Sequence, residues 1–165
     1  MTLNLMKWPR FLIAGAVVLL GACSNNEAKP APSNDVAALG DLINLQFPVR
    51  SARWESFGTP EYTGGVPGPT DFVTLVAELE PEQDWLSDSQ DPTGETYVAP
   101  EAARPWLSAY FRTLLEKNKN SRADLSAQGN CRMYSTTIKK SGRPVNGFMC
   151  NNAGHLLMYL TLSSS

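Results

Sequence analysis

The last third of the chain contains three short stretches rich in apolar residues and bounded by turn residues. They predict strands over residues 131–139, 144–150 and 155–162. The dipeptide Ser141-Gly142 and the segment Asn151–Gly154 separate these strands, and such residues tolerate the positive φ of tight turns. Three antiparallel strands joined by hairpins are therefore expected here.

Two further strands are predicted in the first half of the chain. In residues 49–57, Ala52 and Trp54 fall on one face. Residues 72–79 carry apolar side chains on one side, namely Val73, Leu75, Ala77 and Leu79. Residues 58–70 contain too many Gly and Pro for a strand interior and are too long for a tight hairpin, so they are expected to form an exposed loop.

Two other segments show helical spacing. A short helix is predicted over residues 34–43, with Asn34 as its N-cap. The residues on its apolar face are Val36, Leu39 and Ile43. A longer helix is predicted to begin at Pro105 and to end near Lys117 and Lys119. The residues of its apolar stripe are Leu107, Phe111, Leu114 and Leu115.

This order of elements predicts an α+β domain. The expected architecture is a small antiparallel β-sheet with one main amphipathic helix packed on one face.

The amino-terminal segment has a different pattern. Residues 1–10 carry Lys7 and Arg10 and no acid, and an apolar run follows over residues 11–20. This run falls short of the roughly 20 apolar residues that a spanning helix needs, so it is predicted to be the core of a cleaved signal peptide.

The run ends in Leu20-Gly21-Ala22-Cys23, and here the chain resembles the bacterial lipoprotein class, whose lipobox has this form. The resemblance implies cleavage before Cys23, attachment of lipid to its sulfur, and anchoring of the protein to a membrane through this lipid. Because Ser24 rather than Asp follows, it also implies the periplasmic face of the outer membrane. The alternative is a soluble secreted protein cut after Ala22.

The next residues contain no large apolar side chain and are expected to form a flexible tether. The predicted organisation is a lipoprotein signal peptide over 1–22, the lipidated cysteine and tether over 23–33, and a single periplasmic α+β domain over 34–165.

Composition then excludes several classes of function. The 165 residues contain 16 Asp+Glu and 14 Lys+Arg, for a net charge of -2, so nucleic acid is not an expected partner. Three cysteines and one histidine are too few for the usual zinc sites, and no motif for a nucleophile, a phosphate or a redox pair occurs. No cofactor and no metal are expected, and the chain is predicted not to be an enzyme.

The remaining two cysteines, Cys131 and Cys150, lie near opposite ends of the first late hairpin. In an exported protein this spacing predicts a disulfide, for which chain entropy gives about 3 kcal/mol. The alternative is a free thiol served by His155 as base.

Charge is distributed unevenly along the chain. Residues 55–103 contain eleven acids and no Lys or Arg, whereas residues 104–165 contain nine bases and two acids. The basic half predicts a cationic rim made of Lys117, Lys119, Arg122, Lys139, Lys140 and Arg143, unless acids and bases interleave in the fold.

Aromatic residues among these acids suggest a docking surface for a protein. The predicted partner-binding residues are Tyr62, Glu82, Asp84, Trp85 and Asp88. In the alternative, Trp85 packs into the core. A calcium site over residues 84–95 is disfavoured by the spacing of the acids.

Two functions remain. The first is an outer-membrane-anchored lipoprotein that acts as a non-catalytic binding or envelope-assembly module. The alternative is an immunity or inhibitor lipoprotein that neutralises a periplasm-targeted toxin or lysozyme-type enzyme.

Overall fold

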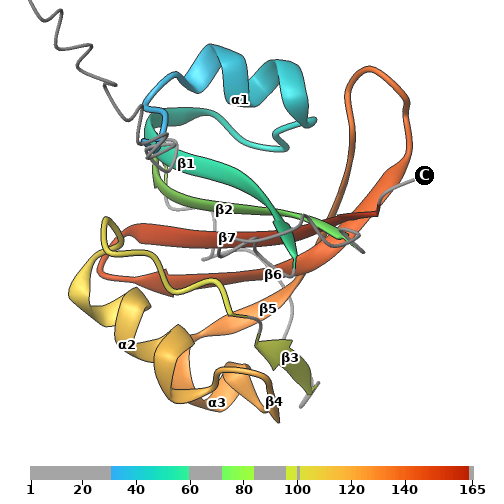
Figure 1. Cartoon of the computed structure of the whole chain (residues 1–165). Helices are drawn as coiled ribbons and strands as arrows, with labels where there is room; N and C mark the ends of the chain where they lie inside the picture. Colours follow the sequence, from blue (N-terminus) through green and yellow to red (C-terminus); the bar gives the residue numbers. More distant parts are fainter. Residues whose placement is uncertain (1–30, 60–71, 84–95, 100, 164–165) are drawn as a thin grey trace, which may run out of the picture.

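A five-stranded antiparallel sheet forms the centre of the protein (Figure 1). The structure is a computed structural model, and it describes residues 31–59, 72–83, 96–99 and 101–163. The strand order is β1-β2-β7-β6-β5. The strands are β1 Val49–Thr59, β2 Phe72–Pro81, β5 Cys131–Thr137, β6 Pro144–Asn152 and β7 His155–Ser163.

Helices lie on both sides of this sheet. The helix α1 (Val36–Leu42) covers one face, and α2 (Ala109–Lys117) and α3 (Leu125–Gly129) lie on the other (Figure 1). We call these the α1 face and the α2 face. The short strands β3 (Tyr97–Ala99) and β4 (Ser121–Ala123) form a second sheet, in which Tyr97 contacts Phe148 of the main sheet. No helix in the described part of the chain is long and apolar enough to cross a membrane.

The last strand, β7, occupies the middle of the sheet and is buried on both faces. Leu157 and Tyr159 point to the α2 face, whereas Leu156, Met158 and Leu160 point to the α1 face. A strand covered on both sides needs a continuous apolar run, and residues 156–160 supply it.

The segment around α1 reaches both edges of the sheet. Ser33 and Trp54 of β1 exchange two backbone hydrogen bonds of 2.8 Å. After α1, the N–H of Asn44 donates to the carbonyl of Thr137 on β5 over 2.9 Å. The residues flanking α1 thus cover part of each edge strand, which limits pairing with other chains.

Two glycines meet steric demands of the sheet. A Cβ at Gly147 in β6 would overlap the carbonyl oxygen of Tyr159 in β7, so only glycine allows these strands to pair here. Gly154 has φ +83° in the turn between β6 and β7, where Ala153 has φ +51°. Two positive φ angles define the type I′ turn that suits a two-residue hairpin.

The predicted antiparallel α+β class is confirmed, and each of the five long strands lies where the sequence predicts a strand. Instead of a single main helix, however, α1 and α2 cover opposite faces. The predicted helix starts were also wrong. Asp35, not Asn34, caps α1 by accepting from the N–H of Ala38 over 2.9 Å, and α2 begins four residues after Pro105.

Candidate functional site

Polar side chains line the end of the α2 face where β1, β2 and β7 lie side by side. Ser51 of β1 is the register partner of Glu80 of β2. The pairing of Leu79 with Leu156 places His155 next to Glu80 on the other side. These three residues form a row across the strands.

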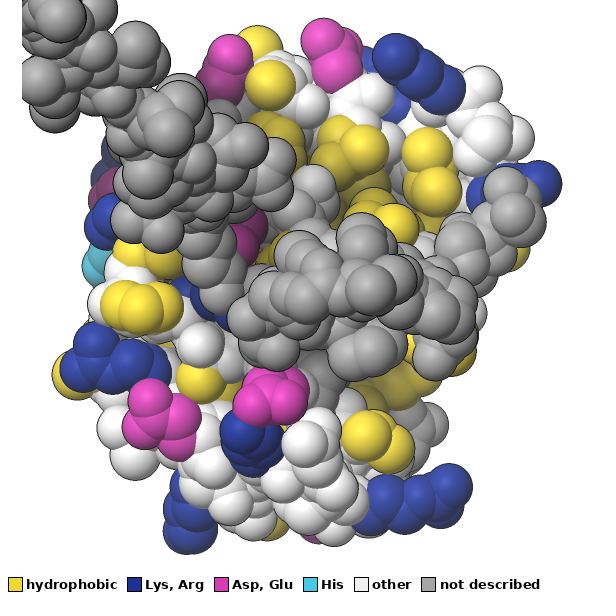
Figure 2. Space-filling view, in the orientation of Figure 1, with side chains coloured by type: hydrophobic (Ala, Val, Ile, Leu, Met, Phe, Trp, Pro, Cys, Tyr) yellow, Lys and Arg dark blue, Asp and Glu magenta, His cyan; other side chains and the backbone are white. Residues whose placement is uncertain are grey.

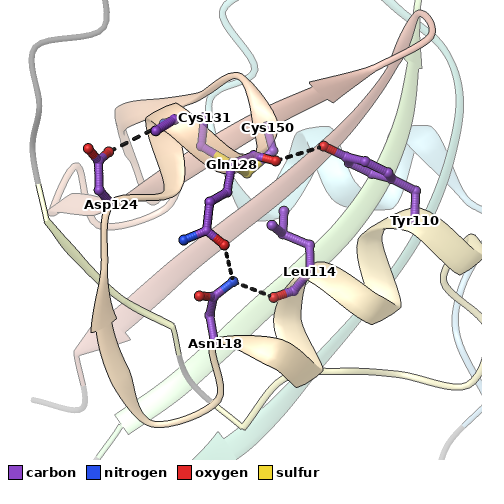
Figure 3. Close-up of a disulfide and its surroundings, with 8 residues drawn as sticks. Tyr110, Leu114, Asn118, Asp124, Gln128, Cys131 and Cys150 are labelled. Carbon is purple, nitrogen blue, oxygen red and sulfur yellow. Dashed lines mark hydrogen bonds between the residues drawn. A yellow bond between two sulfur atoms is a disulfide. The ribbon is translucent and has the colours of Figure 1, made fainter.

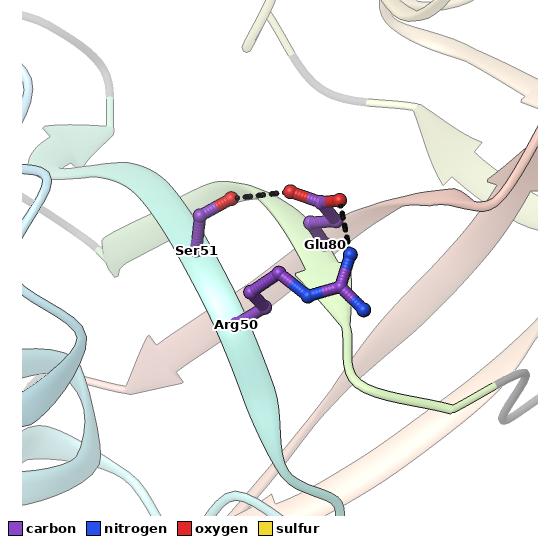
Figure 4. Close-up of polar contacts among 3 residues, drawn as sticks. All are labelled: Arg50, Ser51 and Glu80. Atoms are coloured by element: carbon purple, nitrogen blue, oxygen red, sulfur yellow. Dashed lines mark hydrogen bonds and ion pairs between the residues drawn. The ribbon is translucent and has the colours of Figure 1, made fainter.

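Glu80 is held by two residues of β1 (Figure 4). A guanidinium nitrogen of Arg50 lies 2.8 Å from Oε1, and the Ser51 hydroxyl donates to Oε2 over 3.0 Å. The Arg50 side chain is 61% exposed, so the pair contributes at most about 1 kcal/mol to stability. Its effect is to fix the direction of the carboxylate.

A second row lies one step further along the strands. Arg53 of β1 is opposite Glu78 of β2, which accepts a hydrogen bond of 2.8 Å from the N–H of Ser108. The Arg53 guanidinium lies 5.6 Å from the centre of the Trp106 ring, within the range of a cation–π contact.

A buried ion pair holds Trp106 in this position. Its indole N–H donates to Oε2 of Glu55 over 2.9 Å, and the other oxygen of Glu55 lies 3.4 Å from Nε of Arg104. The guanidinium of Arg104 also lies 3.5 Å from the centre of the Phe57 ring. Both charged side chains are almost fully buried, so this cluster fixes the segment before α2 against β1.

These rows line two adjoining hollows of ≈ 460 and ≈ 310 Å³, which share Glu80 and His155. Glu82 and the turn at Ala153–Gly154 border the smaller hollow. Together they form the terminal groove, which we define by Arg50, Arg53, Glu78, Glu80, Glu82, Trp106 and His155. An aromatic wall surrounded by both signs of charge suits contact with a protein surface.

One of the predicted partner-binding residues lies in the terminal groove. Glu82 is exposed, and its N–H donates to the carbonyl of Pro48 over 3.1 Å. Tyr62, Asp84, Trp85 and Asp88 lie outside the described residues. The choice between a docked and a core position for Trp85 therefore stays open.

Sequence reasoning missed most of the terminal groove. Arg50, Arg53 and Trp106 were not singled out, because the pairing of β2 with β7 and the position of Trp106 are long-range features. A signal did exist in Glu78, Glu80 and Glu82, which repeat with period two on one side of a strand whose other side is apolar.

The predicted disulfide between Cys131 and Cys150 is confirmed (Figure 3). The two residues are register partners on β5 and β6 and are buried beside α2 and α3. Tyr110 of α2 donates to the carbonyl of Gln128 in α3, and Asn118, the C-cap of α2, donates to the side chain of Gln128, which fixes the helices over the disulfide. Both sulfurs are thus in use, and the thiol–His155 alternative lacks its nucleophile.

Acids and bases interleave in the described residues. Figure 2 shows both signs of charge interspersed over the visible face. Glu55 pairs with Arg104, Glu80 with Arg50, and Glu101 with Lys119. The predicted cationic rim is not one surface, because Lys117 ends α2, Lys119 and Arg122 follow it, and the other three residues lie at the turn between β5 and β6.

No three metal-binding side chains gather anywhere in the described ranges, and residues 84–95 lie outside them. No protein-family model, curated protein or solved structure matches this chain.

Proposed function

We propose that the chain is an outer-membrane lipoprotein, anchored to the periplasmic face through lipid on Cys23, whose domain binds another protein without catalysing a reaction. The observation that carries the proposal is the position of the terminal groove. Asn34 lines the larger hollow, and it follows directly after Ser33, the residue that joins the fold at β1.

The distance along the chain supports this proposal. Ser33 is the tenth residue after Cys23, and ten extended residues span at most about 33–36 Å. A partner in the terminal groove would therefore be held close to the membrane. An open groove of mixed charge favours protein contact over enclosure of a small substrate.

The immunity or inhibitor function is the second candidate. It is favoured by Glu78, Glu80 and Glu82, which line the terminal groove and would attract a cationic enzyme. In that case the captured partner is an exported toxin or a cell-wall hydrolase, and its association slows steeply as salt is added.

Lipid attachment is tested with Cys23→Ser. Metabolic palmitate labelling and membrane fractionation should show a labelled wild-type protein in the outer membrane and an unlabelled, mis-sorted variant. Label retained by Cys23→Ser contradicts the lipoprotein assignment.

The terminal groove is tested by affinity capture from detergent-solubilised envelopes. Arg53→Glu places a like charge beside Glu78 and should reduce capture of the partner at least tenfold. Arg122→Glu makes the same charge change on β4, outside the groove, and should leave capture unchanged. Equal capture by both variants contradicts the groove assignment without affecting the anchoring result.

A further inference from the structure

The outer edge of β5 is only partly covered. The carbonyl of Ser135 accepts from the side-chain amide of Gln46 over 2.8 Å, and the carbonyl of Thr137 accepts from Asn44. Two residues after Thr137, the N–H of Lys139 donates to the carbonyl of Leu42 over 3.0 Å. Residues 42–46 thus bond one half of this edge.

These bonds establish which backbone groups face outward. Ser135, Thr137 and Lys139 bond away from β6, whereas the N–H of Ile138 donates to Arg143 within the hairpin over 2.9 Å. Successive residues of a strand direct their backbone N–H and C=O groups to opposite sides. The N–H and C=O of Met133 therefore also face outward, as those of Ser135 and Thr137 do. Among the residues that the structure describes, none bonds either group.

The side chain at this position is also unusual for the sheet. Met133 is 48% exposed, although its register partner Phe148 is only 2% exposed. An exposed apolar side chain beside open backbone groups is a surface to which an extended peptide can add.

The charge of the hairpin indicates the kind of peptide. Residues 131–152 contain four Lys or Arg and no Asp or Glu. Lys139 is paired with Asp41 of α1, whereas Lys140 and Arg143 are exposed at the turn. The hairpin is therefore complementary to an acidic segment.

We propose that the β5 edge at Met133–Ser135 receives an extended acidic segment of a partner protein as an added strand. This surface is separate from the terminal groove and does not depend on the anchor. A second copy of the chain fits less well, because two basic hairpins would repel each other.

The experiment uses the mature chain in detergent and two probe peptides, acetyl-(Glu-Val)₃-amide and acetyl-(Lys-Val)₃-amide. Nuclear magnetic resonance should show shifts and slowed exchange of the Met133 and Ser135 amides with the glutamate peptide. Its affinity should be at least tenfold higher than that of the lysine peptide. Equal affinities, or unchanged amides at millimolar peptide, overturn the proposal.

Proline variants test which backbone N–H groups of β5 face away from β6. Met133→Pro removes only an outward N–H, so it should fold and should bind the glutamate peptide at least tenfold more weakly. The matched Arg132→Pro removes an N–H that faces β6 and should not fold. Unfolding of Met133→Pro overturns the assignment of this edge.

Charge reversal provides an independent variant. Lys140→Glu with Arg143→Glu changes only exposed residues of the turn, so the chain should fold. Its affinity for the glutamate peptide should fall at least tenfold, and unchanged affinity overturns the acidic preference. Self-association that protects the Met133 amide in wild type would identify a second copy as the occupant and overturn the proposal.

Discussion

The two faces of the sheet differ in kind. On the α1 face, α1 packs on an almost wholly aliphatic set of side chains from all five strands. The α2 face holds the disulfide, the buried Glu55–Arg104 pair, the terminal groove and the exposed Met133. The α1 face is a packed core, whereas the α2 face combines a core with surfaces that a partner can reach.

Among the described residues, Tyr134 is the one ionisable residue buried in the core of the α1 face. Burial raises the pKa of the Tyr134 hydroxyl, although hydrogen bonds with Gln46 and Thr136 oppose the shift. The phenol therefore remains neutral near neutral pH. On the α2 face, a guanidinium and a carboxylate are buried together, and the comparison predicts different responses to substitution.

The largest effect is expected from breaking the buried pair. Glu55→Ala removes the carboxylate beside buried Arg104 and the acceptor of the Trp106 indole, so it should lower the free energy of unfolding by about 3–5 kcal/mol. Replacing both charged residues by Met should cost much less. Urea denaturation measures both variants, and a cost below about 1 kcal/mol for Glu55→Ala would show that the pair adds little.

Truncation on the α1 face should separate stability from binding. Leu160 is fully buried, so Leu160→Ala should lower the free energy of unfolding by about 2–5 kcal/mol. Partner affinity of the folded protein should stay unchanged, because Leu160 points away from the terminal groove. A titration below the melting temperature checks this, and a tenfold loss of affinity would mean that the faces are coupled.

The smallest effect concerns the turn beside the terminal groove. Ala153 has φ +51°, and Asn adopts this conformation at lower cost, so Ala153→Asn should stabilise the protein by about 0.5–1 kcal/mol. Thermal melts should show a rise of about 2–4 °C. The control Ala37→Asn, on an exposed helical position of α1, should lower the melting temperature instead.

The sequence predicts the last three strands and the disulfide well because these depend on local pattern. Alternation, turn residues and a single hairpin determine the register that places Cys131 opposite Cys150. The start of α2 is different. Glu55, 51 residues away in sequence, bonds Trp106, and the segment from Arg104 to Ser108 forms a turn rather than the first turn of the helix.

The difference between local pattern and long-range contacts also explains why the sequence predicts only part of the terminal groove. Glu80 and His155 are 75 residues apart in sequence, and only the pairing of β2 with β7 places them side by side. The strands β3 and β4 and the helix α3 have three, three and five residues, which is too short for a periodic signal.

The central position of β7 has a consequence for folding. β2 pairs with β7, so residues 72–79 acquire their second neighbouring strand only when residues 156–163 are available. Contacts of such sequence separation form slowly, because a long loop must close first. A chain that leaves the ribosome from its amino terminus cannot complete this sheet until its final strand has been synthesised. Such a delay would suit the export that we propose for this chain, since a chain that has not yet folded can still be threaded through a membrane.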